Sequence, residues 1–458
     1  EATAARGLAN SGFRTHKRHR LIITPDFKDK RSLTLLFGDA DRVTIYAMDD
    51  LYGKADFSDT RMHNRTPELT IEHPRTRITR FSAAYQQLHE ETRAASELIL
   101  GQIASHDADG ATLVGTSRPF AELALGDELF FRSLPLAALE LLLSAKEFDH
   151  VVIASTDSSA DALMCVLLAG VPALKDHPDV EITSISRNLS RRVAFERTLG
   201  LILPRSEMAV IEGDDIETTL NEPIHAETAP PEGTDFKPVA SFLDYTAGVA
   251  ARLQLWPETD KPRVLMIAGP VGAYDGSTAR YYTSLSRAYN LRTAYFGGNL
   301  VKFSGRVTDA GGNFANENVL PIAVRTKHSS KALNAYLVDR VLEAAAEITS
   351  PTVRHIVSVL KDRFVQTTLV NYFTFYHTCE AWLARLQAEN QLPQVVVQTP
   401  LRNCHVASFC SLSRAVNVPT IALEPHGLNA SYCRYSTVAS DYYGVISTFF
   451  QDEAAKGF

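Results

Sequence analysis

The chain has 458 residues, and its 46 Lys and Arg against 53 Asp and Glu give a formal net charge of −7. A single hydrophobic core stops growing at roughly 250–300 residues, so this length predicts two domains. Hydrophobic residues make up 45% of the chain and charged residues 22%, which is ordinary for globular domains. Because proteins that grip phosphate backbones usually carry a basic excess, nucleic acid is not an expected partner.

The cysteines and the hydropathy pattern point to a reduced, cytoplasmic protein. The five cysteines are odd in number and have no CxxC spacing, so neither a disulfide framework nor a metal site is expected. No stretch approaches the roughly 20 apolar residues of a membrane span. A basic run at 14–20 (RTHKRHR) predicts a solvated surface, with contact to a polyanion or to the anionic inner face of a membrane left open. Residue 1 is Glu rather than Met, so we expect a trimmed chain.

The first half of the chain alternates apolar runs that are typical of buried strands with segments of helical periodicity. We expect strands at 21–23, 43–47, 112–114 and 151–155, and another that opens at 171–173. Helices are expected at 81–105, 134–143 and 160–169, the second with Ser133 as its cap and Pro135 in its first turn. Residues 52–78 are polar and are interpreted as a surface excursion.

An acidic, proline-containing stretch at 213–236, followed by a helix at 237–256, predicts the boundary between the domains. Beyond it the same alternation returns. Strands are expected at 263–269, 395–397, 418–423 and 442–447, and helices at 278–288, 332–349, 352–390 and 406–415, with a break or a bend within 352–390. The predicted fold is α/β, with two Rossmann-like, doubly wound parallel-sheet domains at 1–212 and 261–458, joined by a linker at 213–260.

The most informative motif is the turn Glu424-Pro425-His426-Gly427, which directly follows an expected strand. Ligands bind beyond the carboxyl ends of strands in open α/β sheets. His426 can act as an acid or base near neutral pH, Glu424 can serve as a base or orient His426, and Gly427 lets the backbone approach a ligand. The alternative is a tight turn whose histidine caps the end of a strand.

The surrounding segment resembles bacterial surface-polysaccharide glycosyltransferases of the two-Rossmann (GT-B) class. The resemblance covers about 65 residues, roughly 394–458, and rests on VPT at 418–420, the His-Gly turn, ASDYY at 439–443, Ser447 and Lys456-Gly457. It implies transfer of a sugar from a nucleotide-activated donor, and related capsule enzymes suggest a CMP-linked one. It implies neither a cofactor nor a metal.

Two features depart from that family. Pro425 stands where the family often has Gln. In the family this segment closes the first Rossmann domain and a donor-binding domain follows, whereas this chain stops at Phe458. The resemblance therefore predicts either a fragment without its donor domain, truncated at its C-terminal end, or a chain whose first domain takes that part.

A second candidate is the loop that opens the second domain. Gly269 and Gly272 precede a helix with Thr278 near its start, so backbone N–H groups there can face an anion, and Arg280 can pair with a phosphate. In the family this loop faces the cleft between the domains. An ordinary βα loop is the alternative, because the spacing is neither GxGxxG nor that of a P-loop.

Weaker candidates are the hydroxyl-rich turn 155–159 and the acidic pair Asp49-Asp50, which we interpret mainly as a helix cap and a solvated loop. The histidines His355, His377 and His405 are interpreted as structural.

The resulting hypothesis is a glycosyltransferase of surface-glycan assembly, with His426 and Glu424 as catalytic residues. Gly427, Gly269, Gly272, Thr278, Arg280 and Ser447 are the expected substrate-binding residues. Its partners would be a nucleotide sugar and a glycan acceptor, and a homo-oligomer is left open. Two alternatives remain: a non-catalytic scaffold that binds a glycan or a partner protein, and a sugar-nucleotide epimerase.

Overall fold

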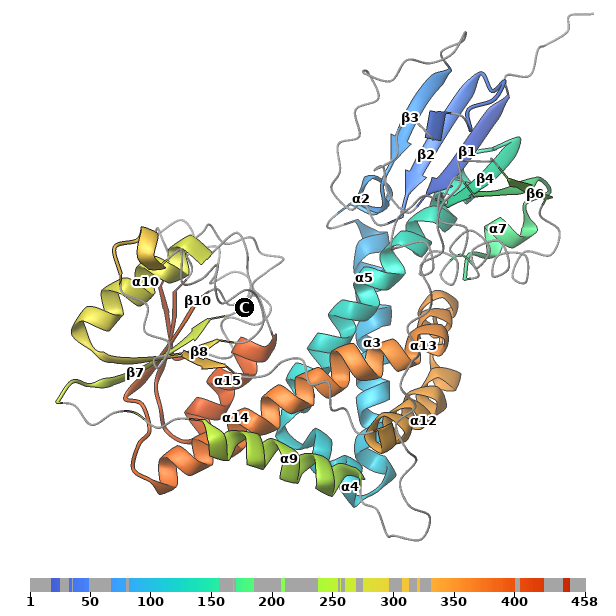
Figure 1. Ribbon diagram of the computed structural model, residues 1–458. Coiled ribbons are helices and arrows are strands. Elements are labelled where there is room, and N and C mark those ends of the chain that lie inside the picture. The colour runs from blue at the N-terminus through green and yellow to red at the C-terminus, as the bar shows by residue number, and fades with distance from the viewer. Residues whose placement is uncertain are drawn as a thin grey trace, which may run out of the picture. The chain divides into compact units, whose positions relative to one another are not determined.

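The computed structural model shows an α/β protein with two parallel sheets (Figure 1). It describes residues 18–24, 33–34, 36–48, 67–79, 82–155, 168, 170–184, 207–210, 238–253, 256, 260–268, 275–295, 307–312, 319–321, 331–399, 404–423 and 440–444. The chain divides into two compact units. The first unit contains Glu1–Leu88 and Phe131–Thr228, and the second unit contains His89–Phe130 and Ala229–Phe458.

Six parallel strands form the sheet of the first unit, in the order β3-β2-β1-β4-β5-β6. The strands are β1 (His19–Thr24), β2 (Arg42–Ala47), β3 (Glu68–Glu72), β4 (His150–Ser155), β5 (Val180–Ser184) and β6 (Glu207–Val210). The central strand β1 is apolar because both its faces are covered, and Leu21, Ile22 and Ile23 are completely buried. The helices that begin in the first half of the chain are α2 (Pro74–Arg77), α3 (Ala83–His106), α4 (Ala108–Val114), η1 (Gly115–Ser117), α5 (Arg118–Ala145) and α7 (Pro172–Asp176).

The sheet of the second unit also has six parallel strands, in the order β12-β11-β10-β7-β8-β9. The strands are β7 (Arg263–Ala268), β8 (Asn290–Tyr295), β9 (Val319–Pro321), β10 (Val395–Thr399), β11 (Thr420–Leu423) and β12 (Tyr442–Gly444). The helices are α9 (Pro238–Arg252), α10 (Asp275–Ala288), α12 (Lys331–Glu347), α13 (Pro351–Arg363), the π-helix η3 (Phe364–Val370), α14 (Asn371–Ala388) and α15 (Cys404–Ala415). Helices α10 and α15 cover opposite faces of this sheet (Figure 1).

The two sheets share one topology. Counted within its own unit, each sheet has the strand order 3-2-1-4-5-6, which is the order of doubly wound nucleotide-binding sheets. The direction of winding reverses between β1 and β4 in the first unit, and between β7 and β10 in the second. The predicted α/β class with two parallel sheets is therefore confirmed, and each unit has one such switch point.

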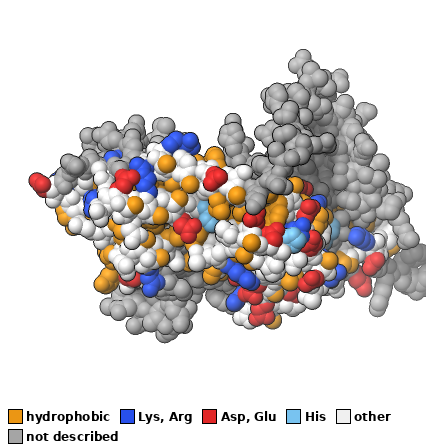
Figure 2. Space-filling model, turned by 90° about the horizontal axis from the view of Figure 1, so that it is seen from below, with side chains coloured by type: hydrophobic (Ala, Val, Ile, Leu, Met, Phe, Trp, Pro, Cys, Tyr) orange, Lys and Arg blue, Asp and Glu red, His pale blue; other side chains and the backbone are white. Residues whose placement is uncertain are grey.

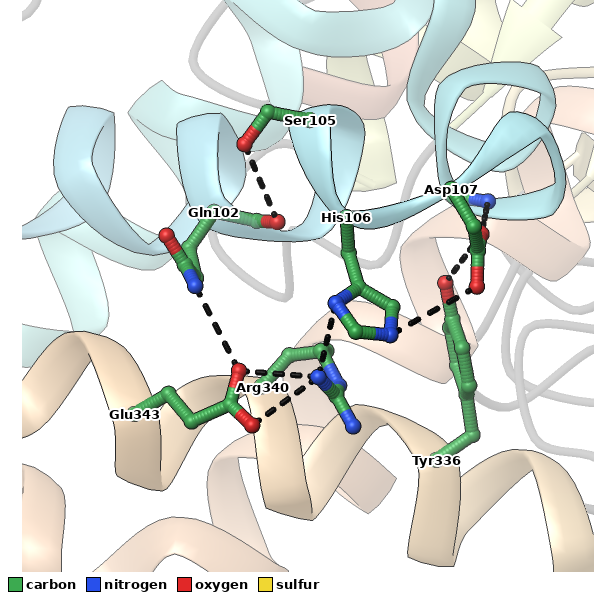
Figure 3. A network of polar contacts seen from close by, with 8 residues as sticks. Gln102, Ser105, His106, Asp107, Tyr336, Arg340 and Glu343 are labelled. Atoms are coloured by element: carbon green, nitrogen blue, oxygen red, sulfur yellow. Dashed lines mark hydrogen bonds and ion pairs between the residues drawn. The ribbon is translucent and has the colours of Figure 1, made fainter.

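The two units do not follow the boundary expected from the sequence, because residues 89–130 belong to the second unit. The division cuts through α3 and α5. At the junction of α3 and α4, the Tyr336 hydroxyl of α12 donates to Asp107 Oδ1 at 2.9 Å, and Arg340 Nη1 lies 2.8 Å from His106 Nδ1 (Figure 3). These contacts attach a segment of the first half of the chain to helices of the second half.

Helix α14 carries the core of the second unit. The predicted helix over 352–390 is continuous, and it widens to a π-helix at η3 instead of breaking. Trp382 of α14 is completely buried and stacks on Trp256, with ring centroids 6.1 Å apart. Arg385 Nη1 donates to the Ala251 and Leu253 carbonyls at 2.7 and 2.9 Å, which caps the C-terminal end of α9.

Several expected elements are corrected. Residues 112–114 are helical in α4 and not a strand, since Asp107 caps that helix by accepting from the Gly110 N–H at 2.7 Å. Pro135 lies inside α5, which begins at Arg118, so Ser133 is not a helix cap. The expected strand at 171–173 is helix α7, which starts at Pro172. The polar excursion at 52–78 contains β3 and α2, and the expected helix at 160–169 lies almost entirely outside the described residues.

Among the described residues, no helix combines the length and apolar character that crossing a membrane requires. On the face shown in Figure 2, acidic and basic side chains are interspersed with hydrophobic ones.

Candidate functional site

The carboxyl edge of the second sheet is where the topology predicts a ligand. Ala268, the last residue of β7, pairs with Thr399 of β10, and Gln398 pairs with Ala422 of β11. The chain therefore leaves β7 and β11 at the same level, on either side of β10. Adjacent strands lie about 4.8 Å apart, so these two exits are separated by roughly 10 Å next to the switch point.

Most of the predicted site residues follow these exits and lie outside the described residues. They are Glu424, His426 and Gly427 after β11, Gly269 and Gly272 after β7, and Ser447 after β12. Thr278 lies in α10, and Arg280 is an exposed residue of the same helix. Because α10 begins at Asp275, three residues before the expected start at 278, Arg280 lies in the second turn of the helix. The hydroxyl-rich turn after Ser155 and the pair Asp49-Asp50 also lie outside the described residues.

The described part of the glycosyltransferase-like segment has a structural role. The carboxylate of Asp441 accepts hydrogen bonds from the Thr420 N–H at 2.8 Å and from the Thr420 hydroxyl at 3.0 Å. The Asp441 N–H in turn donates to the Thr420 hydroxyl at 3.0 Å, and Arg414 Nε lies 3.1 Å from Asp441 Oδ1. Thr420 of the VPT motif and Asp441 of the ASDYY motif thus link the start of β12 to the start of β11.

A buried amide lies under the same segment. Gln398 of β10 is completely buried, and its side-chain N–H donates to the Ser440 hydroxyl. Burial raises the pKa of the neighbouring Cys410 thiol well above its ordinary value, and the Ser440 hydrogen bond offsets this only in part. The Cys410 thiol is therefore neutral, as are the side chains of Gln398 and Ser440. These neutral groups lie on the face of the sheet that α15 covers.

The first turn of α15 brings a cysteine and a histidine together just after β10. Cys404 Sγ lies 3.4 Å from His405 Nδ1. Burial raises the pKa of the Cys404 thiol to about 12, although the residue as a whole is partly exposed, and burial lowers the pKa of His405 to about 4. Both groups are neutral at pH 7, whereas a nucleophilic cysteine needs a thiolate. The pair therefore fits a packed helix start and not a catalytic dyad.

His377 is held in the same structural way. Its Nε2 lies 2.8 Å from the Leu113 carbonyl and its Nδ1 lies 3.1 Å from Glu380 Oε2. With 7% exposure, the imidazole joins α14 to α4 and is closed to a ligand.

The last residue of β3 in the first unit is Glu72, a carboxylate that the sequence analysis did not single out. Glu72 accepts hydrogen bonds from Lys146 Nζ at 3.0 Å, from the Thr76 hydroxyl at 2.9 Å, and from Arg77. Burial disfavours the charge, but these three donors outweigh it and lower the pKa of Glu72. A carboxylate held ionised by two cations is a poor general acid, so Glu72 is a structural anchor.

Searches for similar proteins give this chain no assignment: no model of a known family matches it, and no curated protein matches it. Within the described residues, no group of three or more His, Cys, Asp or Glu side chains is arranged to hold a metal ion.

Proposed function

We propose that the protein transfers a sugar from a nucleotide-activated donor to a surface glycan, using its two units in a GT-B arrangement. The observation that carries this proposal is the repeated strand order 3-2-1-4-5-6, which gives each unit a switch point of the kind that holds nucleotides. The resemblance of residues 394–458 to surface-polysaccharide glycosyltransferases supports the same reaction, and suggests a CMP-linked sugar.

In the proposed reaction, the acceptor hydroxyl attacks the anomeric carbon of the donor. A glycosidic bond forms, the bond from that carbon to the nucleotide phosphate breaks, and the acceptor's proton passes to His426. Glu424 orients the imidazole, and Gly427 admits the sugar close to the backbone. The loop with Gly269 and Gly272 and the start of α10 face the acceptor, and Thr278, Arg280 and Ser447 complete the polar lining.

The proposal depends on the loops after β7 and β11 meeting one substrate. Their roots are close enough for this, since only β10 separates them at the sheet edge. A ligand of nucleotide-sugar size bridges such a distance. Of the described groups near these roots, Cys404 and His405 are neutral, and we assign charge stabilisation to Arg280 and to backbone N–H groups.

The test is thermal stabilisation by CMP-, UDP-, GDP- and CDP-linked sugars. The only two tryptophans, Trp256 and Trp382, are both buried in the second unit, so their fluorescence follows its unfolding. A donor at 100 times its Kd stabilises the folded state by about 2.7 kcal/mol. We expect one nucleotide class to raise the melting temperature, and no response to any donor would favour the scaffold alternative.

The variant His426→Ala separates catalysis from binding. We expect it to abolish sugar transfer while leaving the tryptophan melting curve unchanged. His355→Ala, on α13 of the same unit, is the matched control and should transfer sugar at the wild-type rate. Conversion of the sugar nucleotide to its epimer without transfer would favour the epimerase alternative.

A further inference from the structure

The first unit has a polar pocket at the edge of its sheet opposite to the carboxyl ends of the strands. The pocket has a volume of about 500 Å³ and is lined by Arg18, His19, Arg20, Asp39, Ala40, Asp149, His150 and Asp179. These residues stand at or just before the amino ends of β1, β2, β4 and β5. The volume is within the range of roughly 300–1,000 Å³ that is usual for small-molecule sites.

Among the described residues, Arg20 is the arginine of this pocket that forms no ion pair. Its Nη1 donates to the Leu36 carbonyl at 2.7 Å, and its Nε is buried without a hydrogen-bond partner in the described part of the chain. The guanidinium lies against Gly38, which has φ of +57°, and a Cβ at that position would collide with Nη1. In the part of the chain that the structure describes, a neutral carbonyl and a glycine thus hold the guanidinium in place, without a hydrogen bond to a carboxylate.

The other charged groups of the pocket each contact another residue, and Asp179 Oδ1 lies 3.9 Å from His150 Nε2. Arg18 forms an ion pair with Asp39. Asp149 Oδ2 accepts from the His19 N–H at 2.7 Å, and His150 Nε2 lies 3.1 Å from Glu181 Oε2. A guanidinium that is partly removed from water and donates to a neutral carbonyl is costly, so an anion beside Arg20 would recover part of that cost.

The imidazole of His19 does not supply positive charge at neutral pH. Burial, and then the charges of Arg42 and Lys146, lower the pKa of His19, and its Nε2 lies 3.0 Å from the Thr44 hydroxyl. The permanent positive charges of the lining are the guanidiniums of Arg18 and Arg20. Arginine presents planar donors that match phosphate oxygens.

The carboxylates of the lining restrict what else the ligand can carry. Asp149 and Asp179 would repel a second anionic group, but they accept hydrogen bonds from hydroxyls. We propose that this pocket binds a small phosphorylated polyol of sugar-phosphate size, with its phosphate on Arg20 and its hydroxyls on Asp149 and Asp179. This site is separate from the proposed transfer loops and does not depend on the proposed function.

The experiment is isothermal titration calorimetry of the full chain at pH 7.5 with glucose 6-phosphate, glucose and inorganic phosphate as probes. We expect saturable binding of glucose 6-phosphate, weaker binding of phosphate and none of glucose. Arg20→Met keeps the aliphatic stem and removes the guanidinium, so it should weaken binding by roughly 10- to 100-fold. Arg93→Gln is the matched control, because Arg93 pairs with Glu97 at 2.7 Å on α3, outside the pocket, and it should bind as the wild type does.

A second variant keeps the test decisive if Arg20→Met does not fold. Asp179→Asn changes an exposed side chain, and it should weaken glucose 6-phosphate while leaving inorganic phosphate unaffected. The proposal is overturned if no probe binds saturably or if Arg20→Met binds glucose 6-phosphate as the wild type does. It is also overturned if Asp179→Asn weakens the binding of glucose 6-phosphate and of inorganic phosphate equally.

Discussion

Removing the carboxylate of Asp441 tests whether the glycosyltransferase-like segment stabilises the second unit. In the variant Asp441→Ala, the start of β12 loses its attachment to the start of β11. The buried Thr420 then keeps a backbone N–H and a hydroxyl that have lost their charged acceptor. We therefore expect the second unit to become less stable.

The magnitude follows from the contacts. A hydrogen bond to a charged group contributes about 1.5–3 kcal/mol. Asp441 accepts two such bonds, but its side chain is 30% exposed, so water replaces part of the loss. We expect the free energy of unfolding to fall by about 2–3 kcal/mol for Asp441→Ala, and by about 1 kcal/mol for Asp441→Asn, which keeps one acceptor oxygen.

Urea unfolding followed by tryptophan fluorescence measures the change, because both tryptophans lie in the second unit. Arg414→Gln is the control, since the Arg414 side chain is 47% exposed and its ion pair contributes about 0–1 kcal/mol. If Asp441→Ala unfolds at the wild-type midpoint, or if Arg414→Gln costs as much, the contact does not fasten the strands and our interpretation of the segment is wrong.

Three other substitutions test the packing within each unit. Glu72→Gln should lower the stability of the first unit by about 1–3 kcal/mol at pH 7. This difference should be complete above pH 4.5, the ordinary pKa of a glutamate, and should disappear as the pH falls through the lowered folded-state pKa, as followed by circular dichroism. Arg385→Ala should cost the second unit about 1–3 kcal/mol in tryptophan-monitored unfolding by uncapping α9, and a loss below 0.5 kcal/mol would refute the cap. Gly110→Ala should destabilise the same unit by about 1–3 kcal/mol, since its Cβ would collide with the Ile103 carbonyl and the Tyr336 hydroxyl, and unchanged melting would contradict that close approach.

The sequence predicted β1, β2, β4, β7, β10, β11 and β12 because their signal is local, but it did not predict β3, β5, β6, β8 or β9. Runs such as Val264 to Ile267 and Val395 to Val397 are apolar on both faces, which is the pattern of a strand covered by helices on both sides. The loops that leave these strands could also be placed, because a parallel sheet fixes the edge at which its strands end.

What the sequence could not predict depends on contacts between distant residues. The run Thr112-Leu113-Val114 has strand-like residues, but the cap at Asp107 and the packing of α4 against α9 make it a helix. An amphipathic helix does not specify its partner, so the membership of 89–130 in the second unit was not visible. Glu72 and Asp441 likewise depend on partners that are distant in the sequence. Lys146 lies 74 positions from Glu72, and Thr420 lies 21 positions from Asp441.

Photo-crosslinking with an azido analogue of the stabilising nucleotide, followed by peptide mapping, tests most directly where the donor binds. We predict labels in peptides that contain 269–280 and 424–447, and their loss when unmodified nucleotide sugar competes. Labelling confined to the amino edge of the first sheet, or labelling that competitor does not displace, would contradict the proposed site.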